Sequence, residues 1–185
     1  FRMFLLSLIW LVTSLTLGLL QLLVLTQPEW IVTGTTSMGL FALCSPTTCI
    51  LRAGSAALPL LSLFIGGMML FLSAASMIPA LLCSRHARPI RIIANMQFVS
   101  VFLCAITVVL VPLDLSEVGC SLSELLRSSS CRVGWAYAVC SVSTLLSMCC
   151  PILGRLVAEG RGIDYALVPR KPSTPKQSDS QEFYL

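Results

Sequence analysis

Cysteine is the residue type with the most chemical potential in this chain, which contains 9 of them. Four lie in two short polar segments between long apolar stretches, at Cys44, Cys49, Cys120 and Cys131. Cysteines in such segments form disulfides when the segments face an oxidising compartment. Four cysteines allow three pairings. We favour Cys44–Cys49 and Cys120–Cys131, because each bond then closes its own segment.

The other five cysteines fall within or beside the apolar stretches. Cys104 and Cys140 lie inside such stretches and are expected to pack as small apolar side chains. Cys83, Cys149 and Cys150 lie near the ends of stretches, where structural packing is favoured over reversible palmitoylation.

The remaining reactive side chains form no catalytic or metal-binding pattern. The single histidine, His86, lies between two arginines and is expected to be a solvated loop residue. The sequence has no Cys/His metal spacing, no glycine-rich phosphate loop and no Ser–His–Asp set, and its apolar stretches contain no Asp, Glu, Lys, Arg or His. Pumps, proton-coupled transporters and intramembrane hydrolases normally keep such groups in the membrane. We therefore expect no enzyme activity, no cofactor, no metal and no small-molecule substrate.

The cysteines and the other residues named above must be positioned by four stretches that contain no Asp, Glu, Lys or Arg. They cover residues 3–25, 57–83, 92–112 and 133–153, in a chain that is 56% hydrophobic and only 11% charged. A helix crosses the hydrocarbon layer with about 20 apolar residues and satisfies its own backbone hydrogen bonds there. The sequence therefore predicts an all-α membrane protein, with four transmembrane helices within residues 1–153. The first stretch is longer than a signal-peptide core, so we expect it to be retained.

The basic residues predict the orientation. An even number of spans puts both termini on one side, and that side carries most of the 12 basic residues. It holds Arg2, Arg85, Arg88, Arg91, Arg155, Arg161, Arg170, Lys171 and Lys176, against Arg52, Arg127 and Arg132 on the other. The positive-inside rule then places both termini in the cytosol and the loops 26–56 and 113–132 outside. We expect a multi-pass protein of the plasma membrane. The net charge of +4 follows from this topology and requires no nucleic-acid partner.

Small and polar residues inside the stretches predict how the helices pack. Ser14 with Gly18, and Ser62 with Gly66, form small-xxx-small pairs of the kind that brings helices together in lipid. Asn95 and Gln97 are expected to bridge to neighbouring helices. Tyr137, near the start of the fourth helix, is expected to keep its hydroxyl near the membrane interface.

The first outer loop has the composition of a small sheet. The segments "IVTGT" and "GLFALC" carry β-branched and aromatic residues around glycines, which is typical of short strands joined by turns. Trp30 is followed by Gly39-Leu40-Phe41, then by Cys44 and Cys49, and then by Arg52. This order resembles the first outer loop of the claudin and PMP22 group of four-helix membrane proteins. The expected fold is a left-handed four-helix bundle with a small extracellular antiparallel β-sheet, built mainly from the first loop.

The fourth stretch narrows the resemblance. "CRVGWAYAVC", with Gly134, Trp135, Ala136 and Tyr137, is similar to the start of the fourth helix in the LHFPL (lipoma HMGIC fusion partner-like) tetraspan family. Relatives in that family are partners of other membrane complexes, including the hair-cell mechanotransduction machinery and inhibitory GABA receptors. The resemblance implies a non-catalytic accessory subunit that helps to assemble, traffic or localise another integral membrane protein, such as a channel, receptor or adhesion protein. The alternative is a claudin-like component of cell–cell adhesion or of a barrier.

Residues 154–185 change to polar, proline-containing sequence. They offer too few apolar side chains to offset the entropy of ordering, so we expect a disordered cytosolic tail. The tail ends in Phe183-Tyr184-Leu185, and apolar residues at the last and third-last positions suit the groove of a PDZ scaffold. An inert tail is the favoured alternative.

Overall fold

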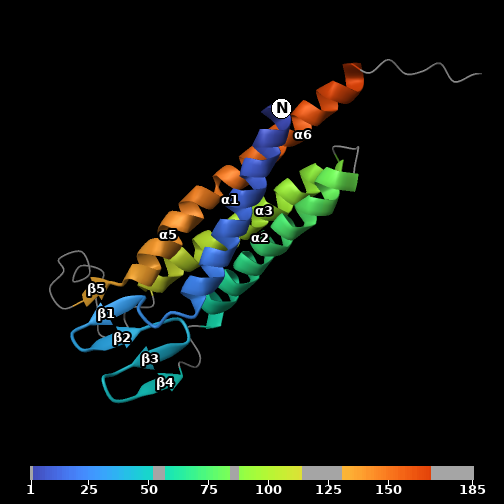
Figure 1. Cartoon of the computed structure of the whole chain (residues 1–185). Helices are drawn as coiled ribbons and strands as arrows, with labels where there is room; N and C mark the ends of the chain where they lie inside the picture. Colours follow the sequence, from blue (N-terminus) through green and yellow to red (C-terminus); the bar gives the residue numbers. More distant parts are fainter. Residues whose placement is uncertain (1, 52–56, 84–87, 114–130, 168–185) are drawn as a thin grey trace, which may run out of the picture.

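The computed structural model describes residues 2–51, 57–83, 88–113 and 131–167. Long helices lie side by side in a bundle, and a small sheet lies at one end of it (Figure 1). The helices are α1 (Arg2–Leu25), α2 (Ala57–Cys83), α3 (Arg88–Leu113), α5 (Trp135–Ser147) and α6 (Cys149–Leu167). In Figure 1, α5 and α6 continue one another as a single rod. The described part of the chain therefore folds as four helical rods and a sheet, with α5 and α6 together forming the last rod.

The four rods are long and apolar enough to cross a membrane. The candidate spans are Phe4–Leu25, Ala57–Leu82, Arg88–Leu113 and Trp135–Gly160. A span of 26 residues is about 39 Å long at 1.5 Å per residue, which exceeds the roughly 30 Å hydrocarbon layer. The outward faces are covered by exposed large apolar side chains, among them Phe4, Leu23, Leu72, Phe98, Phe102, Leu145 and Ile152. This is the surface of a multi-pass membrane protein, because water would leave so much exposed apolar area unfavourably hydrated.

The sheet has five short antiparallel strands in the order β4-β3-β2-β1-β5. Four come from the first loop: β1 (Ile31–Thr33), β2 (Thr36–Met38), β3 (Ala42–Cys44) and β4 (Cys49–Leu51). The fifth, β5 (Cys131–Val133), pairs with β1 and places Ile31 opposite Val133. The expected antiparallel sheet, built mainly from the first loop, is confirmed. The strand β5 adds a contribution from the second loop that the sequence analysis did not predict.

Two buried clusters form the core. One lies where the bundle meets the sheet and includes Trp30, Leu40 and Leu63. The other lies in the half of the bundle away from the sheet and is centred on Trp10 and Met77. The small residues act as the sequence predicts. A Cβ added to Gly66 would lie 2.7 Å from the sulfur of Cys104 and 3.0 Å from a backbone oxygen of α3, so α2 and α3 are in close contact there.

The last rod differs from the sequence prediction in two ways. It is interrupted at Met148, because Pro151 has no N–H to donate to the carbonyl of Ser147. It also continues to Leu167, whereas the sequence predicts a disordered tail from residue 154. The physical reason for the extension is burial: Val157 is fully buried in the cluster around Trp10, which holds this part of the helix on the bundle.

Candidate functional site: the sheet and its junction with the bundle

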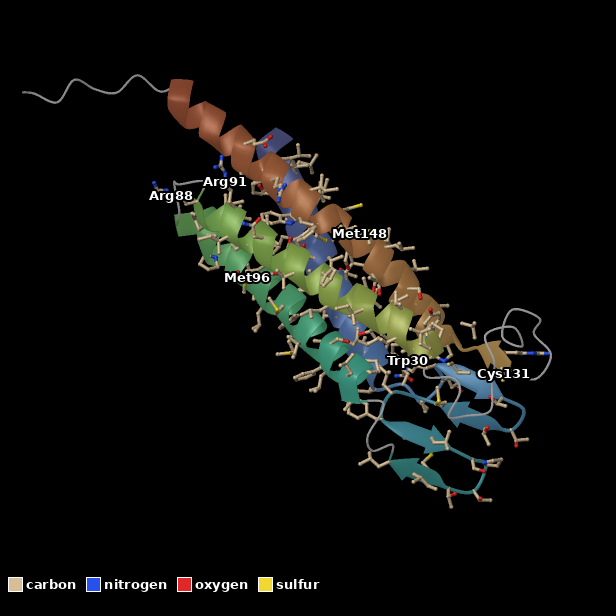
Figure 2. The ribbon with its side chains drawn as sticks, turned by 180° about the vertical axis from the view of Figure 1, so that it is seen from behind. Trp30, Arg88, Arg91, Met96, Cys131 and Met148 are labelled. Carbon is tan, nitrogen blue, oxygen red and sulfur yellow. A yellow bond between two sulfur atoms is a disulfide. The ribbon has the colours of Figure 1, made fainter. Side chains whose placement is uncertain are left out.

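Trp30 is the centre of the junction between the sheet and the helices. Its side chain is fully buried, and its indole Nε1 donates a hydrogen bond of 2.9 Å to the carbonyl of Val24 at the end of α1. Its ring meets that of Tyr137 on α5 edge-on, with 6.3 Å between ring centroids. The Tyr137 hydroxyl donates to the carbonyl of Val108 on α3 over 2.9 Å. Trp30 and Tyr137 therefore tie the first loop to three helices, and Figure 2 shows Trp30 where these elements meet.

The glycines of the two sequence motifs allow backbones to approach one another. A Cβ on Gly39 would lie 2.8 Å from the carbonyl oxygen of Gln27, and a Cβ on Gly134 would overlap the carbonyl oxygen of Glu29. The amide of Gly134 donates to the carbonyl of Trp30 over 2.9 Å, which continues the pairing of β5 with β1. These two glycines thus explain why this loop can fold back so closely on itself and on α5.

The other motif residues divide between the interior and the surface. Leu40 is 2% exposed and Ala136 is fully buried, so both belong to the junction. Phe41 is 39% exposed and Trp135 is 50% exposed, so both remain available at the surface. Arg52 and the C-terminal Phe183, Tyr184 and Leu185 lie outside the described residues, and the PDZ interpretation stays a prediction.

One of the two predicted disulfides is confirmed. Cys44 and Cys49 are bonded, with an S–S distance of 2.09 Å, and they face each other across β3 and β4. Cys131, at the start of β5, is buried and also disulfide-bonded. Its predicted partner, Cys120, lies outside the described residues, so that pairing stays a prediction. Figure 2 shows Cys131 at the end of the sheet where β5 lies.

The β3–β4 hairpin carries an exposed apolar surface. Ile50 is 66% exposed and Leu51 is 76% exposed, and both lie on β4, at the edge of the sheet. Leu43, on β3, is directly opposite Ile50 and is itself 38% exposed. Side chains directly opposite one another lie on the same face of a sheet. We call Leu43, Ile50 and Leu51 the apolar edge.

Buried polar side chains connect the helices in the middle of the bundle. Gln97 on α3 accepts a hydrogen bond from the Trp10 indole over 2.9 Å and donates to Ser14 over 3.1 Å. Gln21 donates to Ser147 over 3.3 Å and accepts from the Cys104 thiol over 3.2 Å. The sequence predicted bridging by Gln97 but did not single out Gln21, whose position as a lone amide within an apolar stretch was the available signal.

The bundle interior offers no charged group for chemistry among the described residues. These polar side chains are paired with one another, so they act as connections between helices. Within the described ranges, no three His, Cys, Asp or Glu side chains lie together in a way that could hold a metal ion. On the sheet, the most exposed large apolar side chains among the described residues are Ile50 and Leu51 of the apolar edge.

Comparison with known proteins adds no relative. Neither a protein-family model nor a curated protein sequence matches this chain significantly.

Proposed function

We propose that this protein is a non-catalytic accessory subunit of another integral membrane protein, such as a channel, receptor or adhesion protein. In this proposal the bundle is left-handed and claudin-like, the sheet is extracellular, and both termini lie in the cytosol of a plasma-membrane protein. Two resemblances support it: that of Trp30 and Gly39-Leu40 to the claudin and PMP22 group, and that of the Gly134-Trp135-Ala136-Tyr137 segment to the LHFPL family.

The apolar edge is the observation that carries the proposal. Edge strands normally avoid exposed apolar residues, because their unpaired backbone groups invite pairing with other chains. Here β4 pairs with β3 alone among the described strands, and its Ile50 and Leu51 are both largely exposed. A partner that adds a strand or an apolar surface at this edge would bury those side chains.

The position of the edge favours a partner in the same membrane. β4 ends at Leu51 and α2 begins at Ala57, so at most a short connection separates the edge from a candidate span. The sheet is also fixed to the bundle through Trp30 and Tyr137, so the edge is presented in a defined orientation. A partner in the same membrane could therefore contact the apolar edge with a domain that lies just outside the bilayer.

The proposal is tested by co-purification after mild detergent extraction and crosslinking. The variant carries Ile50→Ser and Leu51→Ser, and the matched control carries Val133→Ser, which alters an exposed apolar residue (48% exposed) on the opposite edge strand. We expect the unaltered chain and the control to recover the same stoichiometric membrane protein, and the double variant to lose it at equal surface expression. Recovery of that partner with the double variant, or a clean monomer from every expressing tissue, would contradict the proposal.

The same experiment separates the claudin-like alternative. An edge strand at each end of the sheet would also allow copies of this chain to join side by side. In that case crosslinking recovers only further copies of the chain, and cells without native junctions form freeze-fracture strands when they express it.

A further inference from the structure

Two helices on the side of the bundle opposite the α1–α2 pair present matching rows of side chains. On α3, the row has heptad-type spacing, with polar residues nearest the helix start and apolar residues further along: Arg91, Asn95, Phe98, Phe102 and Ala105. On the last rod, the row runs in the reverse direction: Glu159, Arg155, Ile152 and Met148. Because the helices are antiparallel, charged residues meet charged residues and apolar residues meet apolar residues.

The apolar parts of the two rows line a groove of about 410 Å³. Val101, 5% exposed, lies at its base, while Phe98 and Ile152 are 62% and 60% exposed. Met148, where the last rod is interrupted, and Pro151 also line this groove. In a bilayer this groove would face the acyl chains.

The polar parts of the rows line a second pocket of about 240 Å³, formed by Arg91, Asn95, Arg155 and Glu159. Arg155 lines both the groove and this pocket, so the two adjoin at this residue. Among the described residues, these four side chains form no hydrogen bond or ion pair with one another. Two guanidinium groups against one carboxylate leave an excess of one positive charge. Asn95, which the sequence predicts to bridge helices, instead lies exposed in this pocket.

The dimensions fit one leaflet. From Asn95 to Ala105 the α3 row spans about 15 Å at 1.5 Å per residue, which is half of the roughly 30 Å hydrocarbon layer. Figure 2 shows Arg91 at the end of the bundle away from the sheet, with Met148 further toward the middle. An amphipathic molecule with a negative head and an apolar tail would therefore meet complementary surfaces along its whole length.

A second groove, between α2 and α3, differs from the first in having no charged lining residue. The groove between α2 and α3 is larger, about 600 Å³, and is lined by residues such as Met69, Met96 and Pro79 without any charged side chain. Its two serines, Ser73 and Ser76, donate their hydroxyls to their own helix over 2.7 Å each. It offers apolar contact but no site for a charged head.

We propose that the groove between α3 and the last rod binds one anionic glycerophospholipid from the leaflet on the side away from the sheet. The phosphate lies between Arg91 and Arg155, and one acyl chain follows Phe98, Phe102 and Ile152. Basic pockets between transmembrane helices bind anionic headgroups in this way. Glu159 selects a headgroup that also carries a donor, such as the ammonium of a serine head, over a bare phosphate monoester. Binding itself does not depend on the proposed accessory role. The proposed topology, with both termini in the cytosol, makes this leaflet the cytosolic one.

The test is native mass spectrometry of the full chain, purified in detergent and titrated with phosphatidylserine or phosphatidylcholine. The variant carries Arg91→Gln and Arg155→Gln. The matched controls are the single variant Arg88→Gln and the double variant Arg85→Gln with Arg88→Gln. Arg88 is the first residue of α3, at the same end of the bundle as the pocket, and does not line it. Arg85 lies outside the described residues and supplies the second removed charge, three positions earlier in the sequence. Figure 2 shows Arg88 at that end, near Arg91.

We expect the unaltered chain to retain one phosphatidylserine in preference to phosphatidylcholine by about thirtyfold, from two basic contacts with an anionic lipid. The pocket variant should lose most of this preference, and the controls should keep it within about twofold. A variant with Ala105→Trp, which fills the groove, should lower the retention of both lipids. Glu159→Gln should reduce the preference for phosphatidylserine over phosphatidic acid.

Three results would overturn the proposal. The first is that the double variant of Arg91 and Arg155 keeps the full preference for phosphatidylserine. The second is that the double control loses as much of this preference as the pocket variant, which would show a general effect of surface charge. Photocrosslinking from position 102 in cells could also capture a protein helix instead of lipid, which would assign the groove to a partner. Each of these outcomes leaves the apolar edge and its co-purification test unaffected, so the two proposals fail separately.

Discussion

Gly134→Ala should destabilise the junction more than its single added methyl group suggests. The new Cβ would overlap the carbonyl oxygen of Glu29, well inside the 3.4 Å of an ordinary contact, so the two backbones must move apart. Forced overpacking costs about 1–3 kcal/mol. The movement also weakens two backbone hydrogen bonds, from Gly134 to Trp30 and from Ala136 to Glu29, at about 0.5–1.5 kcal/mol each. The expected loss in the free energy of unfolding is therefore roughly 2–6 kcal/mol.

The assay is thermal unfolding of the purified chain in detergent, in which the fraction that stays monodisperse after heating is measured. For a chain of this size the loss corresponds to a fall in Tm of about 4–24 °C. Gly67→Ala is the matched control, because the closest neighbour of its Cβ would be the end of the flexible Leu22 side chain at 3.2 Å, and its next contacts, at 3.5 and 3.6 Å, are ordinary ones. Alanine is also favoured over glycine within a helix by about 1 kcal/mol, so the control should melt at the same temperature or slightly higher. A Gly134→Ala protein that melts within a degree of the unaltered chain would refute the reasoning.

Further substitutions test the other connections. Gln97→Leu leaves two buried partners, the Trp10 indole and a serine hydroxyl, without their hydrogen bonds to Gln97. It should lower the free energy of unfolding in detergent by about 1–3 kcal/mol, the cost of an unsatisfied buried polar group; an unchanged melting curve would show that these bonds contribute nothing. Tyr137→Phe removes the hydroxyl that reaches the α3 backbone and should lower stability by about 0.5–1.5 kcal/mol, with a wild-type Tm as the contrary result. Replacing Cys44 and Cys49 by serine removes a disulfide that closes a short loop and contributes about 2 kcal/mol. Amide hydrogen exchange should then become faster in β3 and β4 but not in the bundle. An exchange rate in β4 equal to that of the unaltered chain would show that the disulfide does not stabilise this hairpin.

The helices were predictable because a membrane-spanning segment has a simple and recognisable composition. A segment that must pass through hydrocarbon lacks charge over about 20 residues, and the four such stretches of this chain correspond to the four candidate spans. The disulfide between Cys44 and Cys49 was predictable for a local reason, since both partners lie in one short hairpin. Local signals of this kind do not depend on the rest of the fold.

The connections between distant segments were not predictable in the same way. The strand Cys131–Val133 has three residues, too few for a periodic pattern, and it forms because β1 offers it a free edge. The pairing of Trp10 with Gln97 joins residues 87 positions apart, and nothing in either stretch specifies the other. The helical extension past residue 153 depends on the burial of Val157 against the first helix. In each case the deciding contact comes from another part of the chain.

The pocket that we propose for a lipid headgroup shows how the fold adds information to a sequence feature. Arg91 and Arg155 enter the sequence analysis only as charges that set orientation. The structure brings them to one pocket with Asn95, at the end of an apolar groove. The sequence carried the heptad spacing on each helix, but only the packing of α3 against the last rod brings the two rows together.

Glycosylation mapping tests the central claim most directly, namely that the sheet and the arginine-rich end of the bundle lie on opposite sides of the membrane. One acceptor site is introduced by an insertion at Gly34, in the turn between β1 and β2, and another in the connection between α2 and α3, each with its own spacer. The account predicts that the first site alone receives a glycan. A glycan at the α2–α3 connection, with none at the sheet, would contradict the topology on which the proposed accessory function depends.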